Sequence, residues 1–89
     1  MIIRFSKIAD KQLHDWITSD RSVAKKIYEL IEDIKINGLI YGKGKPEQLK
    51  YYKDPVRFSR RITQSDRLVY SPVDDDILLI ISCKGHYED

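Results

Sequence analysis

Glu47 and His86 are two side chains of this sequence that could move a proton, and Glu47 lies inside a strongly basic segment. Residues 43–67 contain eight of the sixteen lysines and arginines but only three acids, which gives a net charge of +5 in a chain whose total is +2. Backbone phosphates are the usual partners of such a surface, and their binding weakens as salt rises. A solvated basic face, or a docking face for an acidic protein, explains the charge equally well.

Strand alternation divides the arginines of this segment between two faces. In a β-strand Phe58 and Arg60 share one face, whereas Ser59 and Arg61 share the other. If Phe58 contacts the helices, Arg61 lies on the open face, with Arg67 of the next strand as its neighbour across a tight turn. Arg60 is expected to reach the rim of the sheet, because an unpaired charge in the core would be costly.

Metal-independent cleavage of RNA fits these residue types. The ribose 2′-hydroxyl is the nucleophile, so the protein needs a base for its proton, an acid for the departing 5′-oxygen and cations for the phosphorane charge. Glu47, His86 and the pair Arg61 and Arg67 would supply all three without a cofactor. None of the motifs HExxH, CxxC, GxSxG or the P-loop is present, so we expect no metal site. Taken alone, a histidine near the chain end is more often incidental than catalytic.

Two consecutive amphipathic helices are predicted in the first half of the chain, after a short strand at residues 2–5. Ser6 is suited to cap a helix that runs to about Thr18, and Asp20 to cap a second one. Apolar residues recur every three or four positions in the second helix, which ends at Asn37-Gly38.

The second half of the chain reads as β-structure. A basic loop at residues 42–46 precedes four predicted strands, at residues 49–52, 57–63, 68–72 and 77–83. The last strand is apolar and is expected to be central and covered, at least in part, on both faces. Residues 74–76 are three aspartates and are best explained as a solvated turn. The prediction is an α+β fold with β-α-α-β-β-β-β topology, an antiparallel sheet carrying its helices mainly on one side.

Length and composition limit the number of domains, the use of disulfides and the cellular compartment that the sequence allows. A chain of 89 residues is expected to form one domain, 1–89. Cys83 is the only cysteine and ends an apolar run, so we predict a buried structural thiol, no disulfide and a reducing compartment. No apolar run approaches the length of a membrane span, and the N-terminus does not read as a signal peptide. These features indicate a cytoplasmic protein without a membrane partner.

Four strings resemble a known family: GKGKPEQLK (42–50), SRRIT (59–63), DRLVY (66–70) and the terminal HY (86–87). They closely resemble the YoeB/Txe branch of the RelE-like bacterial toxins, over nearly the whole chain. The resemblance implies a RelE-like fold, in which two N-terminal helices pack on a mainly antiparallel twisted sheet. It also implies a ribosome-dependent mRNA endoribonuclease of a type II toxin–antitoxin system that needs no cofactor.

The resemblance assigns a role to each site residue. Glu47 matches the general base, Arg67 the arginine that stabilises the scissile phosphate, His86 the general acid and Tyr87 a residue that positions the substrate. The family further implies substrate-binding roles for basic residues of the segment, namely Lys43, Lys45, Lys50, Arg60 and Arg61. Among these, Lys43 and Lys45 are expected to contact ribosomal RNA. The chain departs from the family pattern at Gly85 and in its last two residues, Glu88 and Asp89.

The implied partners are mRNA, the ribosome and an acidic YefM- or Axe-like antitoxin, and the modest core is compatible with a homodimer. Two other functions remain open. One is a non-catalytic module that binds RNA or an acidic protein through the same basic sheet. The other is a ParE-like protein acting on gyrase, which the set of Glu47, Arg67 and His86 argues against, because that activity needs no acid–base residues.

Overall fold

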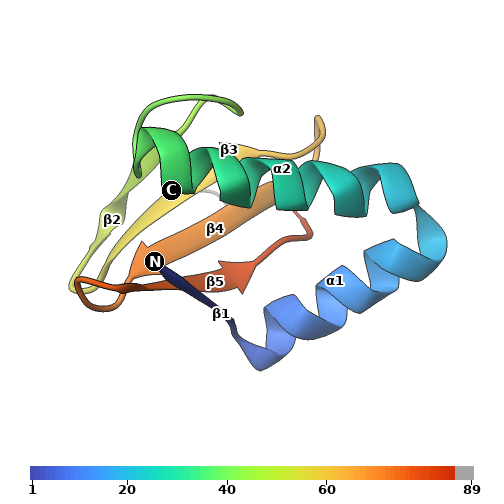
Figure 1. The fold of residues 1–89 in the computed structure, drawn as a ribbon, viewed down its shortest axis with the longest axis horizontal. Helices are drawn as coiled ribbons and strands as arrows, with labels where there is room; N and C mark the ends of the chain where they lie inside the picture. The colour runs from blue at the N-terminus through green and yellow to red at the C-terminus, as the bar shows by residue number, and fades with distance from the viewer. Residues whose placement is uncertain (86–89) are drawn as a thin grey trace.

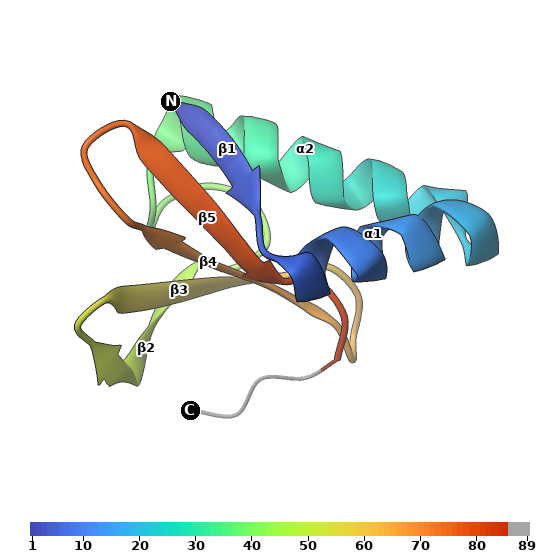
Figure 2. The ribbon, with the colours of Figure 1, turned by 90° about the horizontal axis from the view of Figure 1, so that it is seen from below.

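Two helices cover one face of a five-stranded sheet in the computed structural model, which describes residues 1–85 (Figures 1 and 2). The predictions for His86 and Tyr87 therefore lie outside the described residues. The elements are β1 (Ile2–Phe5), α1 (Lys7–Ser19), α2 (Arg21–Asn37), β2 (Glu47–Lys53), β3 (Val56–Arg61), β4 (Arg67–Pro72) and β5 (Ile77–Ser82). The predicted α+β topology is confirmed.

The strands lie in the order β1-β5-β4-β3-β2, with β1 parallel to β5 and the other neighbours antiparallel. As predicted, β5 is an interior strand. Its residues Leu78 and Ile80 are fully buried, and the residues that alternate with them are partly buried. In Figure 2 the helices lie on one side of the sheet, and β2 bends away on the other side.

Local chemistry accounts for where the helices begin and end. The Ser6 hydroxyl accepts a hydrogen bond from the Ala9 amide at 3.0 Å and caps α1, and the Asp20 carboxylate accepts one from the Ser22 amide and caps α2. Gly38 ends α2 at a φ of +91°, a conformation that costs glycine little. The caps predicted from the sequence are confirmed.

Two strand boundaries differ by two residues from the sequence-based expectation, and four others differ by one residue. Strand β2 begins at Glu47 rather than at residue 49, because Glu47 and the residue after it already pair with β3. Strand β3 ends at Arg61 rather than at residue 63. The Thr63 hydroxyl accepts hydrogen bonds from the amides of Ser65 and Asp66, and this turn begins before the ladder would have reached residue 63.

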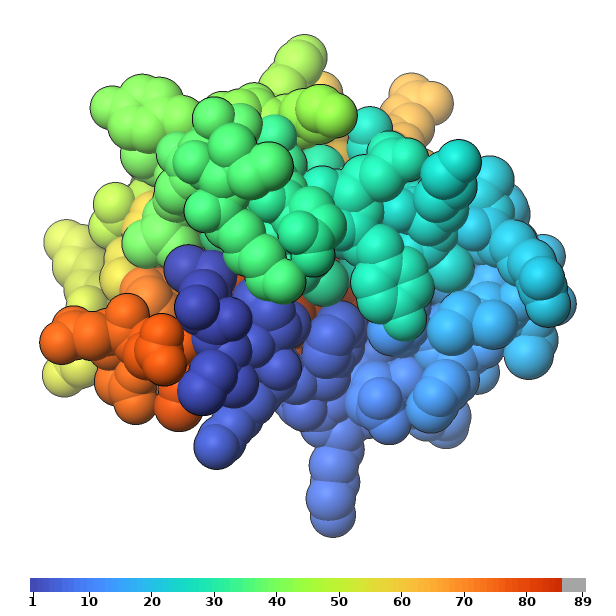
Figure 3. All heavy atoms as spheres, in the orientation of Figure 1, coloured from blue at the N-terminus to red at the C-terminus, as the bar shows by residue number. Residues whose placement is uncertain are grey.

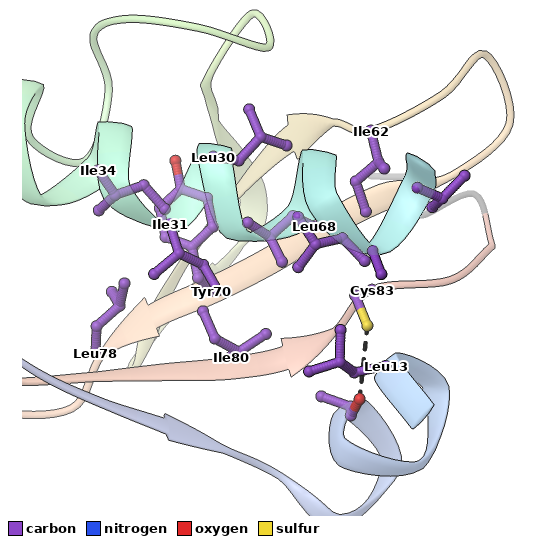
Figure 4. Packing of buried hydrophobic residues seen from close by; sticks show 14 of the residues in the cluster. Leu13, Leu30, Ile31, Ile34, Ile62, Leu68, Tyr70, Leu78, Ile80 and Cys83 are labelled. Atoms are coloured by element: carbon purple, nitrogen blue, oxygen red, sulfur yellow. Dashed lines mark hydrogen bonds between the residues drawn. The ribbon is translucent and has the colours of Figure 1, made fainter. Parts of the chain in front are cut away.

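The hydrophobic core lies between α2 and the facing side of the sheet (Figure 4). Phe58 and Tyr70 stack within it, with ring centroids 5.8 Å apart, so Phe58 has the core position expected from strand alternation. Many members of the core cluster are aliphatic residues spaced along α2 and alternating along β4 and β5: Ile27, Leu30, Ile31, Ile34, Leu68, Leu78 and Ile80.

Cys83 belongs to this core and is 0% exposed. Its thiol donates to the Ala9 carbonyl at 3.5 Å, the contact drawn as a dashed line in Figure 4. Burial, and to a smaller extent the charge of Asp66, raises the pKa of the Cys83 thiol to about 11. The prediction of a buried structural thiol is confirmed.

A thiol reagent should therefore distinguish folded from unfolded protein. At about pH 8 the Cys83 thiol should react with a disulfide reagent at least about 100-fold more slowly in the native protein than in denaturant, because the thiolate is the reactive form. Absorbance of the released thiol measures both rates. Equal rates would show that the side chain is accessible.

Candidate functional site

Strand register places Glu47 on the face of the sheet that carries Arg61. Glu47 pairs with Ser59, and Ser59 pairs with Val69, so these three residues form a row across β2, β3 and β4. Directly paired residues share a face, and this face is opposite to that of Phe58, which packs in the core. Arg61 lies two residues from Ser59 and so is the diagonal neighbour of Glu47. Residues in this relation are typically about 7–8 Å apart across a strand pair.

Arg61 and Arg67 pair directly across β3 and β4, which confirms that they are neighbours. Arg61 is exposed, whereas Arg67 is half-buried. The Nη1 atom of Arg67 donates to the carbonyls of Thr63, Gln64 and Asp66 at 3.0, 3.3 and 3.2 Å. These bonds hold the Arg67 guanidinium over the β3–β4 turn, at the end of the sheet to which Arg61 also belongs.

The basic loop before β2 is held against the end of β3. The Arg61 amide donates to the Gly44 carbonyl at 2.7 Å, which brings the loop alongside Arg61. Lys43 and Lys45, on either side of Gly44, both have exposed side chains, and so does Glu47. The structure therefore gathers a carboxylate and several cations at one edge of the sheet, as expected for an anion-binding surface.

Lys50 lies further along β2 and is exposed, with its ammonium nitrogen 5.2 Å from the centroid of the Tyr51 ring. The β2–β3 register shifts between Gln48 and Lys53, so strict alternation does not assign Lys50 to a face. The sequence placed Lys50 with the residues of the RNA path, and that assignment stays a prediction.

Arg60 does not reach the rim of the sheet, and the expectation that it would was wrong. Its side chain is 0% exposed and its Nη1 atom forms an ion pair with Asp33 of α2. The reason for placing Arg60 at the rim was the cost of an unpaired buried charge, but this charge is fully paired. A side chain so enclosed cannot touch a substrate, so Arg60 drops out of the set of candidate RNA contacts.

Each of the five N–H donors of the Arg60 guanidinium has an acceptor inside the protein. Nε donates to the Tyr70 hydroxyl at 3.0 Å, and Nη1 donates to the Asp33 carboxylate and to the Lys43 carbonyl. The acceptors of Nη2 are two loop carbonyls, both 2.7 Å away, of Gly38 and Tyr41. Arg60 thus connects the sheet, α2 and the loop that follows α2.

Asp33 completes this network from the helix side. One of its oxygens accepts the Lys43 amide at 2.9 Å, and the other accepts the Asn37 amide group at 2.8 Å. The Lys43 amide, followed by the Arg60 guanidinium, holds the pKa of the Asp33 carboxyl below its usual range. Asp33 was not among the residues singled out from the sequence, because it is one of several charged residues that lie between the apolar positions of α2. A buried arginine that needs a counter-ion was the signal that could have revealed it.

Gly42 permits this arrangement. Its φ is +109°, and a Cβ atom at this position would collide with the Asp33 carboxylate. The loop can therefore pass close enough to α2 for Asp33 to bind the Lys43 amide. Asp33 accepts the Lys43 amide and Arg60 donates to the Lys43 carbonyl, while the residue itself is exposed.

The described chain ends beside Arg67. The Arg67 amide donates to the Gly85 carbonyl at 3.0 Å, and the Gly85 amide donates to the Asp66 carboxylate at 2.8 Å. His86 is the next residue in the sequence, and its own position lies outside the described residues, as does that of Tyr87.

Elsewhere on residues 1–85, the hollow along α2 does not include the candidate site residues Glu47, Arg61 and Arg67. This open hollow has a volume of about 710 Å³, and its lining includes Ile17, Tyr28, Ile36 and Lys43. Figure 3 shows the face of the molecule where α2, in green to cyan, is exposed. Within residues 1–85 no cluster of three His, Cys, Asp or Glu side chains is placed to bind a metal ion. No helix in the same residues is long and apolar enough to cross a membrane.

Comparison with known proteins identifies the family. Residues 5–87 match the model of the YoeB-like toxin of bacterial type II toxin–antitoxin systems. Toxin YoeB of Escherichia coli strain K12 is 49% identical over 72 residues, which cover 81% of this chain and 82% of that protein. Two solved structures from Staphylococcus aureus are also similar. A YoeB dimer is 42% identical with a TM-score of 0.87, and a heterotetrameric YoeB–YefM complex is 42% identical with a TM-score of 0.86.

Both Staphylococcus aureus structures cover 98% of this chain and 98% of their own. The chain therefore belongs to the YoeB-like toxin family of bacterial type II toxin–antitoxin systems. The resemblance found in the four sequence strings is confirmed, and with it the two-helix, five-stranded fold.

Removing the buried guanidinium should destabilise the protein strongly. Arg60→Met should lower the free energy of unfolding by about 3 kcal/mol, because Asp33 loses its counter-ion and three loop carbonyls lose the guanidinium donor. The matched control is Arg61→Met at the exposed neighbouring position, which should change it by less than about 0.5 kcal/mol. Urea unfolding followed by circular dichroism measures both values, and similar losses for the two variants would contradict the structural role of Arg60.

Acid should weaken this network in a defined direction. The folded pKa of Asp33 lies below its ordinary value of 3.8, so Asp33 stabilises the fold above that pH. That contribution is lost as pH falls from about 4 through the folded pKa, because the unfolded chain takes up its proton first. Asp33→Asn should therefore show a shallower loss of stability than the unmodified protein between about pH 5 and pH 3. Parallel slopes in urea unfolding would remove Asp33 from the acid response.

Proposed function

We propose that this toxin is a ribosome-dependent mRNA endoribonuclease that inhibits translation. The observation that carries the proposal is the shared sheet face of Glu47, Arg61 and Arg67, in which a carboxylate is the diagonal neighbour of one of two paired arginines. A base beside cations that face a phosphate is what 2′-hydroxyl attack requires. Membership of the YoeB-like toxin family supports the same reading.

In the proposed reaction Glu47 takes the proton of the ribose 2′-hydroxyl, and the 2′-oxygen forms a bond to phosphorus. The bond from phosphorus to the 5′-oxygen breaks, and His86 donates a proton to that oxygen. The products are a 2′,3′-cyclic phosphate and a free 5′-hydroxyl. Arg67, with Arg61, stabilises the charge of the phosphorane, and the reaction uses no metal ion.

The remaining candidate residues bind rather than react. Lys50 and Arg61 are proposed to line the path of the mRNA, and Lys43 and Lys45 to contact ribosomal RNA. Each is exposed on the described surface. Tyr87 is proposed to position the substrate by stacking on a base. Arg60 has no part in binding, because its guanidinium is enclosed within the protein.

The proposed partners follow from charge and from the relatives. The Staphylococcus aureus structures contain a YoeB dimer and a YoeB–YefM assembly. We propose an acidic YefM- or Axe-like antitoxin for this toxin, which would neutralise the basic face, and a homodimer as its free form. Residues 1–89 would act as a single toxin domain in the cytoplasm, where the ribosomes are.

The carboxylate gives the decisive test. Glu47→Gln should reduce cleavage of a defined mRNA on translating ribosomes by about 100- to 10,000-fold, since it removes the general base without changing side-chain size. Primer extension to the new 5′ ends measures the cuts. Glu29→Gln on α2, another exposed glutamate, should cleave like the unmodified toxin.

Two results would count against the proposal. Cuts that persist unchanged in Glu47→Gln would remove the assigned base. If the unmodified toxin made no cuts at all but bound RNA or an acidic protein through the basic face, the molecule would be a non-catalytic binding module.

A further inference from the structure

The segment that follows β5 is fixed by side chains of α1 and of the β3–β4 turn, and by one backbone hydrogen bond from the start of β4. The Cys83 amide donates to the Gln12 side-chain oxygen at 2.7 Å, and the Trp16 ring nitrogen donates to the Cys83 carbonyl at 2.9 Å. Gln12 and Trp16 both belong to α1, so one helix binds both backbone polar groups of Cys83. The ammonium nitrogen of Lys84 also lies 5.1 Å from the centroid of the Trp16 ring.

Two residues later, at Gly85, the partners are Asp66 of the β3–β4 turn and Arg67 of β4. The Gly85 amide donates to one Asp66 oxygen at 2.8 Å, and the Gly85 carbonyl accepts the Arg67 amide at 3.0 Å. The second Asp66 oxygen accepts the Thr63 hydroxyl at 2.7 Å, which fixes the carboxylate in the β3–β4 turn. Gly85 itself has a φ of +89°, which a residue with a side chain adopts only with strain.

The backbone amides and carbonyls of Cys83 and Gly85 thus each have a partner, and these partners come from α1, from the β3–β4 turn and from the first residue of β4. Water would satisfy the same groups on an unconstrained chain end, and ends are ordinarily ordered only where something ties them down. Here these hydrogen bonds fix the position of Gly85, directly beside Arg67.

We propose that Asp66 is a positioning residue for the acid step of RNA cleavage: it holds Gly85 so that the residue after it, His86, is presented to the departing 5′-oxygen. This inference rests on the proposed function. Asp66 touches no reacting atom in this scheme and acts only through the backbone of Gly85. Losing the clamp should impair protonation of the leaving group and spare the attack that Glu47 promotes, because a displacement of about 1 Å can cost on the order of 100-fold in rate.

A change of leaving group isolates that step. The substrate is a short synthetic mRNA that carries one sulfur in place of the bridging 5′-oxygen at the cleaved bond, presented on the ribosome. A thiolate leaves without being protonated, so the phosphorus–sulfur bond breaks with the electron pair staying on sulfur and no general acid needed. Cleavage rates of this RNA and of the ordinary RNA are compared under single-turnover conditions.

Asp66→Ala should cut the ordinary RNA about 10- to 100-fold more slowly than the unmodified toxin, and the sulfur-containing RNA at nearly the same rate. Asp66→Asn keeps an oxygen that can accept the Gly85 amide and should recover most of the loss. The matched control is Asp74→Ala, which removes another turn carboxylate that accepts backbone amides, in the β4–β5 connection. It should leave both rates unchanged.

Hydrogen exchange reports on the clamp without any reaction. The Gly85 amide should lose protection in Asp66→Ala and keep it in Asp66→Asn, with the amides of β4 unaffected. Equal slowing on both RNAs in Asp66→Ala would overturn the positioning role in favour of a general structural one, and so would unchanged cleavage with the amide deprotected.

The variant His86→Ala distinguishes failure of the positioning role of Asp66 from failure of the proposed RNA-cleavage mechanism. If His86→Ala is rescued by the sulfur-containing RNA and Asp66→Ala is not, the clamp is refuted and the acid stands. If neither His86→Ala nor Asp66→Ala slows the ordinary RNA, or if the unmodified toxin cuts neither RNA, the proposed mechanism itself is refuted.

Discussion

The buried charge of Arg60 is the constraint on which the position of the basic loop and of the sheet edge beside it depends. A guanidinium inside a small core is tolerated only when its donors are satisfied, and here that demand is met by α2, by a core tyrosine and by three carbonyls of the loop after α2. The loop must turn its carbonyls inward to do this. Its lysine side chains are consequently left on the outside, at the edge of the sheet where Glu47 begins β2.

Arg60 and Arg61 show how strand alternation separates a buried charge from an exposed one. They are adjacent and identical in type, yet one is enclosed and the other is exposed. The difference comes from the face of β3 on which each lies, since the helix side offers a carboxylate and carbonyls while the opposite side offers solvent. Arginine suits both places, because its five donors can be divided among many acceptors and its charge persists at any physiological pH.

What the sequence predicted well was local. Helix caps, the end of α2 at Gly38, the hairpin turns and the neighbourhood of Arg61 and Arg67 all follow from residues close together in the chain. The position of Arg60 was wrong because its counter-ion lies 27 residues away on α2, and nothing near residue 60 reveals it. The start of β2 at Glu47 and the ties on Cys83 and Gly85 were missed for the same reason. They depend on partners that only the assembled fold brings near.

The parallel pairing of β1 with β5 joins the first strand to the last. The Ser6 hydroxyl that caps α1 also donates to the Ile81 carbonyl, across 75 positions of sequence. While the chain is being synthesised, β1 has no partner and α1 has no sheet to rest on until β5 has left the ribosome. Such distant contacts form late in folding. The sheet on which the helices rest is therefore completed only after its last strand has been synthesised.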